Sequence, residues 1–194
     1  MQVILVGFIG YGLWTGKPKT VTNAAAGLAI TFVPAIIERN YRIALDPFLA
    51  FWITTAVFLH TLGSAGLYAT VGWWDHLTHG ASASIIAAIG YIVVRAIDAH
   101  HDEIVLPTRF FVVFVVSFVL AFGVLWELFE FGLDVFAAAT GIEMPLAQHG
   151  LDDTVKDLQF NAIGALIVGL WGQAYLTGVG EKLAERFTDT GDPG

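Results

Sequence analysis

The sequence contains no cysteine among its 194 residues. This absence excludes disulfide bonds, thiolate nucleophiles and metal sites with sulfur ligands. Charged residues are also scarce, because they make up 13% of the chain, whereas a soluble domain typically carries about a quarter. Lys and Arg together number 9 against 17 Asp and Glu, which gives a net charge of −8. An acidic chain of this kind is not expected to bind nucleic acid.

Long apolar blocks occupy most of the remaining sequence. Hydrophobic residues make up 56% of the chain, and the mean hydropathy is +0.71. The composition therefore predicts an all-α fold, a polytopic transmembrane helical bundle with residues 1–194 as a single integral-membrane domain and 180–194 as an acidic polar tail. The first of about six spans is short, because 13 residues make a helix of about 20 Å against a bilayer core of about 30 Å. The predicted spans are 2–14, 21–37, 47–66, 74–97, 108–136 and 153–178.

Basic residues predict the orientation of these spans in the cell membrane. Short loops that are rich in Lys and Arg usually face the cytoplasm. With the spans numbered as above, two lysines, Lys17 and Lys19, lie on one side of the membrane. We therefore expect the opposite side, with both termini, to be cytoplasmic. The six basic residues on that side are Arg39, Arg42, Arg95, Arg109, Lys182 and Arg186.

Ionisable side chains nevertheless occur inside the predicted spans, and they gather toward one end of the bundle. Spans three and five run outward and carry these residues near their outer ends, whereas spans four and six run inward and carry them near their starts. With a rise of about 1.5 Å per residue, most of them lie within about 15 Å of the outer helix ends. The residues concerned are His60, Asp75, His76, His79, Glu127, Glu130, Asp134, Asp152, Asp153 and Asp157.

Their spacing places several of these residues on common helix faces. Asp75 and His79 are four residues apart, and Glu127 and Glu130 are three apart, so each pair shares a face. Ionisable groups in lipid are costly, and they usually face the bundle interior, where they are paired or functional. Lys156 is the one nearby basic residue, so ion pairing cannot neutralise so many acids. The negative charge of these acids must therefore be compensated in another way: by a bound cation, by bound protons or by water in an outward-open cavity.

A divalent metal is the compensation that we favour. Carboxylates and imidazoles without sulfur suit zinc, manganese or iron, and helix bundles build such sites from facing helices. The predicted metal ligands are Asp75, His79, Glu127, Glu130, Asp157, His76 and Asp153. The residues predicted to support them are His60, Asp134, Asp152, Thr154 and Asn161. Plainer interpretations stay open: an aspartate at a helix start is an ordinary N-cap, and Asn161 suits a hydrogen bond between helices.

The same residues lie in three motifs, WWDHLTHG, LWELFEF and GLDDTVKDLQFNAIGAL. In this order they resemble the YjdF-type family of small bacterial and archaeal inner-membrane proteins, which is related to the VanZ-like family. The resemblance covers about 75–170 and implies a multi-span membrane protein; the VanZ-like connection hints at envelope chemistry. His76 departs from the pattern, which commonly has a basic residue there. The matching positions are Asp75, His79, Glu127, Glu130, Asp153, Thr154 and Asp157.

Three functions fit these features. A metal at the extracytoplasmic end of the bundle could activate water and act on an envelope or lipid substrate, although no catalytic residue can be assigned. A second hypothesis is a cation- or proton-coupled transporter or binding protein for a cationic or amphiphilic ligand. A third is a structural lipid-packing protein, which leaves the acidic residues unexplained. Membrane lipids are the expected partners in each case, and a homo-oligomer is an alternative to a monomer.

Overall fold

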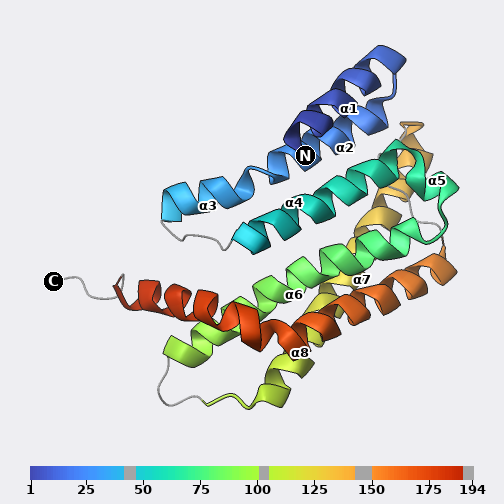
Figure 1. The fold of residues 1–194 in the computed structure, drawn as a ribbon. Helices are drawn as coiled ribbons and strands as arrows, with labels where there is room; N and C mark the ends of the chain where they lie inside the picture. The colour runs from blue at the N-terminus through green and yellow to red at the C-terminus, as the bar shows by residue number, and fades with distance from the viewer. Residues whose placement is uncertain (42–46, 101–104, 143–149, 190–194) are drawn as a thin grey trace.

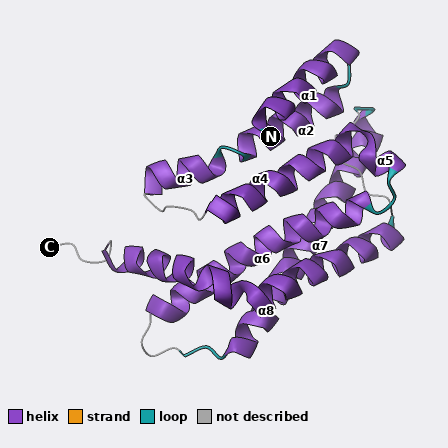
Figure 2. Cartoon of the chain, in the orientation of Figure 1, coloured by secondary structure: helices purple, strands orange, loops and turns teal. Residues whose placement is uncertain are grey.

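The computed structural model describes residues 1–41, 47–100, 105–142 and 150–189, and every regular element in these ranges is a helix (Figures 1 and 2). The predicted all-α bundle is therefore confirmed. The elements are α1 (Gln2–Thr15), α2 (Pro18–Ile30), α3 (Val33–Tyr41), α4 (Pro47–Leu62), a π-helical segment η1 (Gly63–Leu67), α5 (Tyr68–Thr70), α6 (Trp74–His100), α7 (Thr108–Thr140) and α8 (Leu151–Asp189).

All six predicted spans fall on helices, but the sixth, 153–178 in α8, is not among the described segments that are long and apolar enough to cross a membrane. Four segments in the described ranges are long and apolar enough to cross a membrane, Pro18–Asn40, Pro47–Thr70, Trp74–His100 and Thr108–Thr140, and Gln2–Thr15 is a shorter apolar helix. The second predicted span consists of two helices, α2 and α3, with a turn at Thr31 and Phe32. The predicted polar tail is helical as far as Asp189, and its last residues, 190–194, lie outside the described ranges.

Helix boundaries follow ordinary stop and start signals. The left-handed residue Gly16 (φ 65°) ends α1, and Pro18 occupies the first turn of α2, so these two helices form a hairpin. Pro107 precedes α7, and the left-handed Gly141 (φ 72°) ends it. Glycine suits both left-handed positions because it has no Cβ.

Apolar side chains cover much of the outward surface of α7. Leu125, Leu128 and Phe129 are all well exposed, and they occupy the same stretch of helix as two glutamates. Contiguous exposed apolar surface of this kind is rare on monomeric soluble proteins. In a bilayer it is the expected lipid-facing surface, while the polar residues turn inward.

The packing of α6 against α8 is the closest in the bundle, and small residues make it so. A Cβ added at Gly164 of α8 would overlap the carbonyl oxygen of Gly80 in α6, and one at Gly172 would lie 3.4 Å from Cδ2 of Tyr91. Ala83 and Ala165 are buried in the core beside this contact. Small residues therefore let the two helices approach closely, and the contact at Gly80 and Gly164 holds α6 and α8 side by side.

Candidate metal site

The first residues of the site lie at the start of α6. Asp75 is in the first turn of this helix, and His79 follows one turn later on the same face. The Nε2 atom of His79 lies 3.8 Å from Oδ1 of Asp75. The predicted i, i+4 pairing is therefore present, with both side chains partly buried.

The third residue comes from α8. Asp157 is only 3% exposed, and its Oδ2 atom lies 3.7 Å from Nε2 of His79. One ligand atom from each of Asp75, His79 and Asp157 can be chosen so that all three lie within 4.8 Å of one another. Metal–ligand bonds to nitrogen and oxygen are about 2.0–2.2 Å long, so a small inward movement of the side chains would let one ion contact all three.

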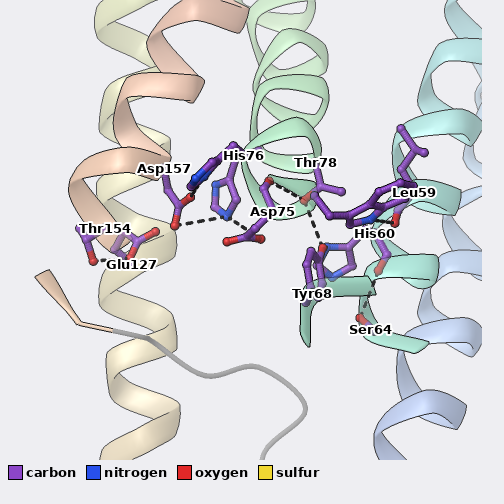
Figure 3. Close-up of polar contacts among 12 residues, drawn as sticks. Leu59, His60, Ser64, Tyr68, Asp75, His76, Thr78, Glu127, Thr154 and Asp157 are labelled. Atoms are coloured by element: carbon purple, nitrogen blue, oxygen red, sulfur yellow. Dashed lines mark hydrogen bonds and ion pairs between the residues drawn. The ribbon is translucent and has the colours of Figure 1, made fainter. Parts of the chain in front are cut away.

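His76 lies at the edge of this group. Its ring stacks on that of Phe160, with centroids 4.6 Å apart and planes 3° from parallel. Its Nδ1 atom is 3.7 Å from Oδ1 of Asp157, too far for a hydrogen bond. Within the described part of the chain, both atoms are buried without a hydrogen-bond partner. The stacking fixes the ring, and it leaves polar atoms that a ligand could satisfy. Figure 3 shows His76 beside Asp157.

Glu127 is tied to the site through a different contact. It is 6% exposed, and its Oε2 atom accepts a hydrogen bond of 2.7 Å from the hydroxyl of Thr154. Its Oε1 atom is buried and has no hydrogen-bond partner among the described residues. Thr154 is one turn before Asp157 on α8, so this bond joins α7 to the helix that supplies the third carboxylate (Figure 3). The prediction that Thr154 supports the site agrees with this contact.

Three other predicted acids do not belong to the three-residue group formed by the described residues. Glu130 is partly buried one turn after Glu127, and it experiences the negative charges of Glu127, Asp75 and Asp157. Asp153 is partly buried in the first turn of α8, and Asp134 lies one turn beyond Glu130. Their roles as ligands or as supporting residues stay predictions.

Asp152 instead forms an ion pair at the protein surface. Its carboxylate forms an ion pair of 2.6 Å with Lys156, the nearby cation identified from the sequence. This hydrogen bond lowers the pKa of Asp152. Lys156 thus forms its ion pair with Asp152 at the surface and not with the buried Asp157. Among the residues that the structure describes, no Lys or Arg forms an ion pair with the three-residue group.

Asn161 packs where α7 and α8 approach each other. It is buried, and a Cβ added at Gly123 would lie 2.9 Å from its Nδ2 atom. This glycine therefore makes room for the amide one turn below Asp157. The position agrees with the expectation that Asn161 joins two helices, and it places a polar group directly beneath the site.

A network that includes His60 supports α6 from the other side. The hydroxyl of Tyr68 lies 2.6 Å from Nδ1 of His60 and 3.2 Å from the hydroxyl of Thr78, which donates to the carbonyl oxygen of Asp75. Sequence reasoning missed Tyr68. It reaches His60 because the helix is kinked at Gly66, whose φ is 148°. The two nearby glycines, at 63 and 66, were the available signal of an irregular helix.

The indole of Trp74 adds a second connection between α4 and α6. Its Nε1 atom donates a hydrogen bond of 3.0 Å to the carbonyl oxygen of Leu59. Together with the His60 network, this bond holds the start of α6 against the end of α4. The start of α6, which carries Asp75 and His79, is thus held from two sides: α8 packs against it through glycines, and α4 is joined to it by hydrogen bonds.

Comparison with known proteins places the chain among membrane proteins. The sequence model of a family described as "Predicted membrane protein (DUF2238)" matches residues 1–178. An uncharacterized protein from Thermotoga maritima is 27% identical over 135 residues, which are 69% of this chain and 66% of that protein. The chain therefore spans slightly less than two thirds of the length of this relative. No solved structure matches.

Proposed function

Since this chain belongs to the DUF2238 family of predicted membrane proteins, we propose that it is an integral membrane protein that binds a divalent metal ion through Asp75, His79 and Asp157. The observation that carries this proposal is the convergence of two carboxylates and one imidazole within 4.8 Å of one another. The buried oxygen of Asp157 without a hydrogen-bond partner is the second support. Burial of an uncompensated carboxylate is costly, and a cation would offset that cost.

The kind of metal and its chemistry follow from the ligands. Imidazole and carboxylate suit zinc, manganese or iron. Three protein ligands leave a coordination position open, and catalytic zinc sites use this arrangement to activate water. Water activated at this end of the bundle would act on an envelope or lipid substrate. The VanZ-like connection, which points to the same compartment, stays a prediction.

Proton or cation transport is the second candidate, and it has its own supporting observation. Glu127 and Asp157 each keep a buried carboxylate oxygen without a hydrogen-bond partner in the described ranges, so they could exchange protons. Transport needs no resident metal, whereas the first proposal requires one. Metal content therefore separates the two.

The metal proposal is tested by elemental mass spectrometry of detergent-purified protein, after incubation with zinc, manganese or iron(II). Wild type should retain about one ion per chain, because a three-ligand site holds a single metal. His79→Gln should lose most of it. The control is His100→Gln, which changes the same residue type at the opposite end of α6 and should retain the metal. Wild type without metal under all three conditions would overturn the proposal.

The site is proposed to face the extracytoplasmic side. Lys17 lies in the α1–α2 turn, at the same end of the bundle as the site, and Asn40 lies near the end of α3 (Figure 1). Because the chain has no cysteine, each can be labelled singly after substitution. An impermeant maleimide should label Lys17→Cys in intact cells and Asn40→Cys only after lysis. The reverse pattern would invert the orientation.

A further inference from the structure

A cavity of about 500 Å³ opens beside the candidate metal site, among α2, α4, α6, α7 and α8. His79 belongs to both the site and the cavity wall, and Asn161 lines the cavity directly beneath Asp157. Pockets that hold small molecules are typically about 300–1,000 Å³, mostly apolar, and carry a few polar groups. This cavity has those properties, and none of the contacts described above fills it.

The polar groups of the cavity are collected at one end. On α6 the lining changes from Thr78 and His79 to Ile86 as the helix leaves the site, and on α4 it changes from His60 to Ile53. The same order holds on α2, where Asn23 precedes Ile30 by two turns. Because α4 runs in the direction opposite to α2 and α6 (Figure 1), this agreement reflects depth in the bundle and not position along the chain.

One further polar atom points to an occupant at that end. The Nδ2 atom of Asn23 is buried and has no hydrogen-bond partner within the described residues. A buried amide donor without a partner is costly, so an acceptor from a ligand would stabilise it. The apolar end, by contrast, offers aliphatic side chains such as Ile53 and Val119. One molecule that fits both ends has a polar head and an apolar chain.

We infer that the cavity binds the hydrocarbon chain of a phosphate-bearing lipid, with its head at Asp75, His79 and Asp157. The inference rests on the proposed metal site, because an ion with an open position is what would draw a phosphate oxygen to a group of carboxylates. Without the metal these acids would repel it. The membrane surrounds this cavity with such amphiphiles, and the cavity orients them with the head toward the candidate centre.

The experiment measures binding of dodecyl phosphate and of dodecanol to the purified, metal-loaded full-length protein by native mass spectrometry. Two variants fill the cavity from different helices, Ser82→Phe and Ala26→Phe; both positions line the cavity and are exposed to it. Each should weaken dodecyl phosphate binding about tenfold or more, since a chain and a phenyl ring cannot share the space. The matched control is Ser117→Phe, at an exposed position of α7 outside the lining, and it should bind as wild type does.

The head is tested with His79→Gln, which should weaken dodecyl phosphate binding and leave dodecanol binding unchanged. Equal binding of dodecyl phosphate by wild type and both cavity variants would overturn the inference. So would a dimer that both cavity variants dissociate, because a second copy of the chain would then be the occupant. Metal content measured on the same samples separates the proposals: metal without alkyl binding overturns the lipid inference alone, whereas absence of metal overturns the metal site and the head assignment together.

Discussion

Asp157→Asn should lower the melting temperature of the metal-loaded protein and raise that of the metal-free protein. With metal present, the wild type gains stability because the ion binds only the folded state, by about 4 kcal/mol when the free metal is a thousandfold above its Kd. The amide is a poor replacement for a buried carboxylate ligand, so most of this gain disappears. Without metal, the substitution removes a buried negative charge that Asp75, Asp153 and Glu127 repel.

Thermal unfolding in detergent, with excess metal and with excess chelator, measures both effects. The matched control is Asp152→Asn, five residues earlier on α8, where the carboxylate is exposed and paired with Lys156. Exposed ion pairs contribute little to stability, so this variant should melt near wild type in both conditions. A higher melting temperature for Asp157→Asn in the presence of metal would contradict the metal site. In that case the buried carboxylate of Asp157 only destabilises the folded protein.

Gly164→Ala should destabilise the protein and release the metal at the same time. The added methyl group would overlap the carbonyl oxygen of Gly80, and a backbone atom cannot move aside without separating α6 from α8. Overpacking of this kind typically costs about 1–3 kcal/mol in free energy of unfolding. His79 is adjacent to Gly80, and Asp157 is two turns from Gly164, so a wider helix spacing pulls the two ligands apart.

The control for this change is Gly132→Ala on α7, where a Cβ would meet no atom within 4 Å. Alanine favours the helix by about 1 kcal/mol relative to glycine, so this variant should be as stable as wild type or more so, and it should keep the metal. Melting curves and metal content of the two variants make the comparison. If Gly164→Ala retains both properties of wild type, the close crossing of α6 and α8 does not hold the site.

Composition and residue spacing were enough to predict the helical membrane class and the end of the bundle where the polar residues gather. Depth along a helix depends on a constant rise per residue, so the common level of Asp75, Glu127 and Asp157 could be inferred without coordinates. The shared face of Asp75 and His79 followed in the same way from their i, i+4 spacing.

Which acid faces which histidine could not be inferred in this way, because it depends on the rotation of each helix about its own axis. That rotation is set by packing between helices: Gly164 against Gly80 turns Asp157 toward His79, whereas the carboxylate of Glu127 meets the hydroxyl of Thr154. Glu130 belongs to the same predicted stripe as Glu127, yet it stays outside the three-residue group. Spacing within one helix cannot distinguish these outcomes, since it contains no information about the neighbouring helix. The glycines at 63 and 66 indicated an irregular helix, but only the structure shows that the kink at Gly66 brings Tyr68 to His60.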